Sequence, residues 1–155
     1  MHQSRISGHG GGPAILLAED DRLLRKAAET ALRRHGFRVL AASNGDEALR
    51  LAFSEIPDLV LLDLIMPGVQ GYEVLKALKN NKATAAIPVV ILTNLGRDSD
   101  VQQALDAGAA AYAIKTNISL VDLVALVSGI LLTGESTPST SRRPARGAGP
   151  TNSAG

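Results

Sequence analysis

The sequence contains no cysteine and few aromatic residues, and both features restrict its chemistry. Without cysteine there are no disulfides, thiolate nucleophiles or thiolate metal ligands, which fits a reducing cytosol. The core must be built from Leu, Val, Ile and Ala, which suits helices packed on a sheet. The aromatic residues of the chain are Phe37, Phe53, Tyr72 and Tyr112.

Long apolar runs and an excess of one charge are also missing. No uninterrupted apolar stretch approaches the roughly 18 residues that a membrane helix needs, and the polar, glycine-rich start has no apolar signal region. The formal net charge is +1 at pH 7, so no global field favours nucleic acid or a membrane as partner. We therefore expect a cytoplasmic protein.

The length of 155 residues predicts one folded domain between two irregular ends. We interpret residues 1–13 as a flexible N-terminal segment and residues 133–155, rich in Ser, Pro, Gly and Arg, as a disordered tail. The folded domain is expected over residues 14–132. Since no second folded pattern follows it, the sequence predicts no output domain in this chain.

Strand-like and helix-like segments alternate through the folded part. Short apolar runs predict strands at residues 14–19, 37–41, 59–63, 88–93 and 110–115. Helical periodicity predicts helices at residues 21–35, 44–53, 71–79, 98–108 and 119–132. This order predicts an α/β fold of the flavodoxin-like, doubly wound (βα)5 type, with a five-stranded parallel sheet whose strands all end at one edge.

Asp63 directly follows the apolar run Leu59–Leu62 and precedes Met66-Pro67-Gly68. A carboxylate there points into the crevice where open α/β sheets bind ligands, although a turn cap is the ordinary role of a lone Asp. Convergence of further polar residues on the same edge favours a chemical site. The polar residues that end or follow the other strands are Glu19, Asp20, Thr93 and Lys115.

Together these residues are typical of a site that takes a phosphoryl group. Glu19, Asp20 and Asp63 supply hard oxygen ligands that suit Mg²⁺. Asp63 would be the nucleophile, and a carboxylate needs no general base at neutral pH. Lys115 and Thr93 would stabilise the transferred group.

The neighbouring polar residues have structural explanations. Asp21 fits a helix N-cap, and His35 fits a cation at a helix C-terminus. His2 and His9 lie in the predicted flexible start. No histidine is therefore placed to act as a general base.

These residues and their spacing resemble a response-regulator receiver domain, the phospho-accepting half of two-component signalling, of the stand-alone single-domain type. The resemblance covers residues 14–132. It rests on Glu19-Asp20, on Asp63 with Met66-Pro67-Gly68, on Thr93 at an interval of 30 residues and on Lys115 after a further 22.

The resemblance implies a phosphorelay in which Asp63 takes a phosphoryl group from the phosphohistidine of a sensor histidine kinase or a histidine phosphotransferase. It implies Mg²⁺ as the cofactor, bound by Asp20, Asp63 and the backbone carbonyl of Ile65. Glu19 would act through water. The family phosphorylates and dephosphorylates itself, so we do not expect an enzyme that turns over an external substrate.

The resemblance also implies a switch made of Thr93 and Tyr112. Thr93 would move toward the phosphoryl group and Tyr112 would swing inward behind it, although a half-buried strand tyrosine is an equal reading of Tyr112. The chain would then signal by docking residues 98–132 on a kinase, phosphotransferase or downstream protein target. A phosphorylation-dependent dimer is left open.

Two residues depart from the family's pattern. Thr116 stands where a proline usually follows the lysine through a cis bond. A cis bond before a non-proline residue costs about 3 kcal/mol, so we expect a trans peptide and a reshaped loop. Asn94 stands where a small residue usually follows Thr93, and we expect it to change the lifetime of the acyl phosphate.

Three other functions fit the sequence less well. A small flavodoxin-like enzyme or nucleotide binder needs a glycine-rich loop after the first strand, but the glycines of residues 8–12 precede that strand. A haloacid-type phosphatase needs a second acid at the position of Ile65. A degenerate receiver that acts as a phosphorylation-independent interaction module is disfavoured, because all five site residues are present.

Overall fold

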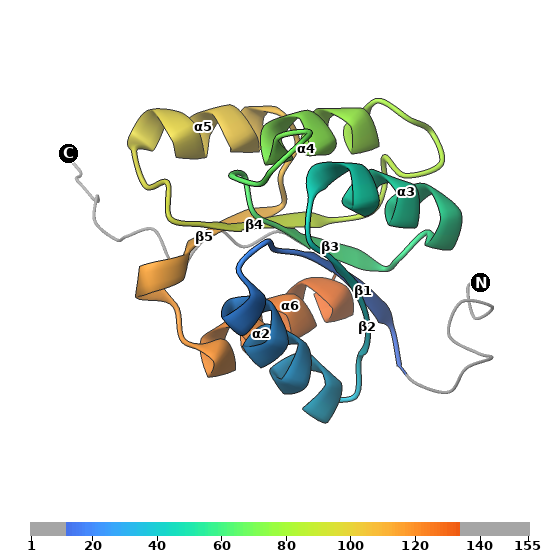
Figure 1. Cartoon of the computed structure of the whole chain (residues 1–155), viewed down its shortest axis with the longest axis vertical. Coiled ribbons are helices and arrows are strands. Elements are labelled where there is room, and N and C mark those ends of the chain that lie inside the picture. Colours follow the sequence, from blue (N-terminus) through green and yellow to red (C-terminus); the bar gives the residue numbers. More distant parts are fainter. Residues whose placement is uncertain (1–11, 134–155) are drawn as a thin grey trace.

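The computed structural model describes residues 12–133, which form a five-stranded parallel sheet between two layers of helices (Figure 1). The predicted α/β class is thereby confirmed. The predictions for residues 1–11, including His2 and His9, and for residues 134–155 lie outside the described residues. In chain order the elements are β1 (Ala14–Ala18), α2 (Arg22–Arg34), β2 (Arg38–Ala42), α3 (Gly45–Glu55), β3 (Leu59–Leu62), α4 (Gly71–Lys79), β4 (Val89–Thr93), α5 (Asp98–Asp106), β5 (Ala111–Ile114), the 3-10 helix η1 (Lys115–Asn117) and α6 (Leu120–Thr133).

The strand order across the sheet is β2-β1-β3-β4-β5, and every neighbouring pair is parallel. The central strands β1, β3 and β4 are buried along their whole length, as continuous apolar runs in a sheet covered on both faces require. The chain order reverses between β1 and β3. At such a switch point, open α/β sheets leave a crevice outside the carboxyl ends of the strands.

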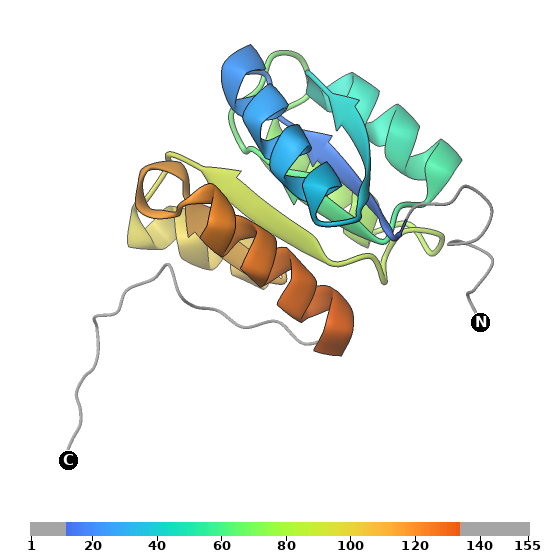
Figure 2. The same ribbon diagram turned by 90° about the horizontal axis from the view of Figure 1, so that it is seen from below.

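Helices α3, α4 and α5 cover one face of the sheet, and α2 and α6 cover the other (Figures 1 and 2). Alternate side chains of each strand therefore enter different cores. In β3, Leu62 packs on the α3–α4–α5 side and Leu61 on the α2–α6 side. Full burial of such a side chain contributes about 1.5–3 kcal/mol, so the two cores hold the sheet edge that carries the polar residues.

Helices α2 and α3 begin at residues whose side chains accept hydrogen bonds from backbone N–H groups of the first turn. The Asp21 carboxylate accepts from the Leu24 N–H at 3.0 Å, which confirms Asp21 as the N-cap of α2. The Asn44 side chain accepts from the Glu47 N–H at 2.8 Å. Gly36, with a φ of 98°, follows α2 in the left-handed conformation that favours glycine.

The loop after β5 differs from the expected strand end. Strand β5 ends at Ile114, so Lys115 begins η1 instead of ending the strand. No peptide bond within residues 12–133 is cis, which confirms the trans bond expected before Thr116. Among the helices of this part of the chain, none has the length and apolar character to span a bilayer.

Candidate functional site

The sheet register brings Glu19 and Asp63 together. Ala18 of β1 pairs with Leu62 of β3, so the residues that follow leave the sheet side by side. The Asp63 N–H donates to the Ala18 carbonyl at 3.1 Å, which extends the pairing by one residue. The predicted convergence of these two acids is therefore confirmed, and it follows directly from parallel pairing.

Lys115 lies between these two buried acids. Its Nζ is 2.7 Å from Asp63 Oδ2, and it is 2.9 Å from Glu19 Oε1 and 3.0 Å from Glu19 Oε2. Only Oε2 of Glu19 has the angles of a hydrogen bond, and Oε1 is buried without a hydrogen-bond donor. Glu19 and Asp63 are 1% and 4% exposed, so this ammonium is the cation that lets both carboxylates be buried.

Burial shifts the protonation equilibria of this group. Desolvation raises the pKa of Glu19, and the hydrogen bond from Lys115 offsets only part of that effect. Burial alone would lower the pKa of Lys115, but its hydrogen bonds to Asp63 and Glu19 outweigh it and raise the pKa. Lys115 therefore stays a cation at neutral pH.

Asp20 completes a group of acids that we call the acid pocket: Glu19, Asp20 and Asp63. One carboxylate oxygen from each lies within 4.8 Å of the others, and Asp20 is exposed at the rim. Carboxylate oxygens are the hard donors that Mg²⁺ and Ca²⁺ bind. The donor set fits a divalent cation at this edge, and Glu19 Oε1 accepts no hydrogen bond although it lies 2.9 Å from Lys115 Nζ.

The loop after β3 is held against the acid pocket by close backbone contacts. The Ile65 N–H donates to Asp63 Oδ1 at 3.0 Å, and the Gly71 N–H donates to the Leu64 carbonyl at 3.0 Å. A Cβ at Gly71 would collide with the Asp63 carbonyl, and one at Gly45 would collide with the carbonyl of Val69 in the same loop. Sequence reasoning placed Gly45 at a helix start and missed this second role.

Thr93 and Tyr112 both contact Leu95, in the loop after β4. Thr93 is buried at the end of β4, and its Oγ1 accepts from the Leu95 N–H at 3.5 Å, the outer limit of a hydrogen bond. The Tyr112 hydroxyl donates to the Leu95 carbonyl at 2.7 Å. The two predicted switch residues thus share one backbone partner.

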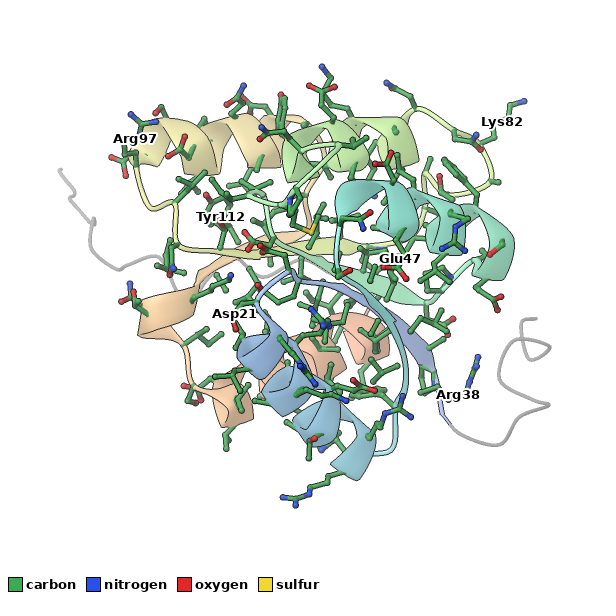
Figure 3. The ribbon with its side chains drawn as sticks, in the orientation of Figure 1. Asp21, Arg38, Glu47, Lys82, Arg97 and Tyr112 are labelled. Carbon is green, nitrogen blue, oxygen red and sulfur yellow. The ribbon has the colours of Figure 1, made fainter. Side chains whose placement is uncertain are left out.

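Tyr112 lies in β5 and is 6% exposed, so it is more deeply buried than a half-buried strand tyrosine. Figure 3 shows its side chain on the side of the sheet that α5 covers. Burial, with smaller contributions from the charges of Asp100 and Asp63, raises the pKa of Tyr112 to about 12. The ring therefore stays neutral, and its hydroxyl remains a donor.

Sequence reasoning also missed Arg25, in the first turns of α2. Its Nη1 donates to the carbonyl oxygens of Glu19 at 2.8 Å and of Asp20 at 3.3 Å. A signal was present, because residue 25 lies one helical turn after the N-cap Asp21 and therefore faces the same turn of the chain. Figure 3 shows Asp21 at the start of α2, where this turn ends.

Comparison with known proteins gives the family. Residues 15–128 match the response regulator receiver domain. Protein PilH of Pseudomonas aeruginosa is 36% identical over 101 residues, which cover 65% of this chain and 84% of PilH. The transcriptional regulatory protein AfsQ1 of Streptomyces coelicolor is 38% identical over 123 residues, which cover 79% of this chain and 53% of AfsQ1.

Solved structures agree with this match. The receiver domain of the Francisella response regulator 1452 superposes with a TM-score of 0.73 at 27% identity, and covers 80% of this chain and 100% of that one. A response regulator from Chloroflexus aurantiacus gives a TM-score of 0.72 at 31% identity, covering 77% and 98%. Several curated relatives are longer transcriptional regulators, of which this chain spans about half or less. The chain belongs to the receiver domain family of two-component response regulators.

Proposed function

We propose that Asp63 accepts a phosphoryl group from the phosphohistidine of a sensor histidine kinase or a histidine phosphotransferase. The observation that carries this proposal is the way Asp63 is held. Its Oδ2 is 2.7 Å from Lys115 Nζ and its Oδ1 accepts from the Ile65 N–H at 3.0 Å. A carboxylate buried and oriented from both sides, at the edge where such sheets bind ligands, suits a nucleophile better than a turn cap.

In the proposed step, a carboxylate oxygen of Asp63 attacks phosphorus in line with the bond to the donor imidazole. The new O–P bond forms as the P–N bond breaks, and the imidazole leaves with the electron pair and takes a proton from solvent. Lys115 would transfer its hydrogen bond from Asp63 Oδ2 to an oxygen of the phosphoryl group, and the Thr93 hydroxyl would donate to another.

The acid pocket is proposed as a Mg²⁺ site. Asp20, Asp63 and the backbone carbonyl of Ile65 would hold the ion, with Glu19 acting through water. When bound, Mg²⁺ would neutralise charge on the phosphoryl oxygens. The proximity of the three carboxylates, within 4.8 Å, supports this assignment.

Signalling is proposed to run through Leu95, because Thr93 and Tyr112 both bind its backbone. If Thr93 moves toward a phosphoryl group, it would pull on this loop. The Leu95 carbonyl, which accepts the hydrogen bond of Tyr112, would then shift as well. The surface formed by residues 98–132 would then bind a downstream protein. The protein itself is modified and restored in each cycle, so we propose no turnover of an external substrate.

The test is incubation with acetyl phosphate and Mg²⁺, followed by intact-mass spectrometry, with beryllofluoride binding as a second probe. Wild type should gain one phosphoryl group, and Asp63→Asn should gain none because the amide is not a nucleophile. Asp106→Asn is the matched control, since Asp106 is an exposed acid at the end of α5. A wild type that takes up no phosphoryl group would instead support the phosphorylation-independent interaction module.

A further inference from the structure

We propose that Arg25 is a positioning residue of the acid pocket, which holds the backbone between β1 and α2 so that Asp20 and Glu19 present their carboxylates to a divalent cation. The inference rests on the proposed Mg²⁺ site and adds a residue to it. Arg25 Nη1 donates to the Glu19 carbonyl at 2.8 Å and to the Asp20 carbonyl at 3.3 Å. Arg25 therefore binds the main chain of the pocket rather than its carboxylates.

These two carbonyls determine the conformation of Asp20. The Glu19 carbonyl belongs to the peptide plane before Asp20, and the Asp20 carbonyl belongs to the plane after it. Peptide planes are rigid, so fixing both planes leaves the two backbone dihedrals of Asp20 little freedom. The direction of the Asp20 Cα–Cβ bond follows from those dihedrals. One guanidinium thus helps to set the point from which the carboxylate extends.

Other contacts hold the turn together with Arg25. The Glu19 N–H donates to the Ala42 carbonyl of β2 at 3.0 Å. The Asp21 N–H donates to Glu19 Oε2 at 3.0 Å, and Asp21 caps α2. The Asp21 N–H and the Asp20 carbonyl belong to one peptide plane, so Glu19 and Arg25 hold that plane together. The peptide plane before Asp20 is held by Arg25, through the Glu19 carbonyl.

Because Arg25 binds carbonyl groups, the Asp20 carboxylate stays available to a cation. Within residues 12–133, neither Arg25 nor Asp20 takes part in an ion pair. An arginine that paired with the Asp20 carboxylate would compete directly with a cation for it. By binding carbonyls, Arg25 orients Asp20 and leaves its oxygens open toward the other two acids.

Charge and position predict opposite effects of removing Arg25. Its positive charge repels a nearby cation, so electrostatics alone predicts that Arg25→Ala binds Mg²⁺ more tightly. A positioning role predicts weaker binding, because Asp20 loses its fixed direction. Arg22 is an exposed arginine in the same helical turn, so Arg22→Ala removes the same charge and none of these bonds.

The experiment is calorimetric titration of the full, metal-free chain with MgCl₂ at constant ionic strength. We expect Arg25→Ala to bind Mg²⁺ about 10-fold more weakly, as for residues that orient metal ligands. Arg22→Ala should match wild type or bind slightly more tightly. Arg25→Lys should lie between wild type and Arg25→Ala, because a lysine keeps the charge but not the planar fork of donors. If Arg25→Ala does not fold, Arg25→Lys provides the test.

A measurement without metal separates positioning from charge. In Arg25→Ala, the backbone amide of Asp21 should exchange with deuterium faster than in Arg22→Ala, because the turn that brings it to Glu19 is looser. If wild type binds Mg²⁺ and Arg25→Ala binds it equally or more tightly, this inference is overturned while the proposed Mg²⁺ site stands. A wild type that binds no Mg²⁺ would overturn the proposed cation site, and this inference with it.

Discussion

Replacing Lys115 by Met removes the ammonium that lies against both Glu19 and Asp63 and keeps a side chain of similar volume. In the wild type, Nζ is 2.7 Å from Asp63 Oδ2 and 2.9 Å from Glu19 Oε1. The variant leaves two carboxylates with almost no exposure facing each other without a cation. We therefore expect the free energy of the folded state to rise and the protein to unfold more easily.

The geometry gives the size of this loss. At an effective dielectric constant of about 20, each of these contacts supplies about 6 kcal/mol of gross attraction, most of which the desolvation of the charges cancels. Removing one partner of a buried pair typically costs about 3–5 kcal/mol. The side chain of Lys115 is 15% exposed, so water can reach the variant pocket, and we expect the lower end, about 3 kcal/mol. That corresponds to a fall in Tm of about 10 °C.

The assay is urea denaturation at neutral pH, with EDTA and again with MgCl₂. Lys82→Met is the charge-matched control, because Lys82 points into solvent beyond α4 (Figure 3). Mg²⁺ should stabilise Lys115→Met more than wild type, since the ion replaces the missing cation and no longer meets its repulsion. A loss below about 1 kcal/mol relative to Lys82→Met would refute this reasoning, as would equal stabilisation of both proteins by Mg²⁺.

Three further substitutions test separate parts of the site. Burial raises the pKa of Glu19 from 4.5, so between 4.5 and this raised pKa the folded protein holds a proton that the unfolded chain has released. The unfolding free energy should therefore fall as pH rises through this window, and Glu19→Gln should flatten the slope in urea midpoints. Gly45→Ala should cost about 1–3 kcal/mol in thermal melts, because its Cβ would meet the Val69 carbonyl, and an unchanged melt would contradict the close contact. Asn94→Ala should change the dephosphorylation rate of the phosphorylated protein, and equal rates would remove Asn94 as a determinant of lifetime.

The order of the elements and the meeting of the acids were predictable because both depend on local pattern and on topology. Apolar runs and helical periodicity are properties of short segments, and parallel connection forces every strand to end at the same edge. For this reason the sequence alone predicts that Glu19 and Asp63 lie close together. The end of β5 was not predictable to the residue, because Lys115 directly follows the apolar run of the strand yet begins η1.

Contacts between side chains and distant backbone were beyond the sequence. The hydrogen bond from the Tyr112 hydroxyl to the Leu95 carbonyl, at 2.7 Å, joins residues that are far apart in the sequence and could not be predicted from it. Arg25 could be read as an ordinary helix-surface residue until the turn after β1 was seen to fold back over it. Gly45 carries no sign that another loop passes so near.

By itself, the sequence determined the class of the fold and the residues at the carboxyl edge of the sheet, and it suggested the chemistry proposed for them. Side-chain type and segment periodicity are enough for those conclusions. Only the tertiary structure decided that Lys115 joins the two buried acids, that Leu95 links Thr93 to Tyr112 and that Arg25 holds the turn of Asp20. These contacts join residues through angles and distances of about 3 Å, and such precision arises only when whole elements pack against one another.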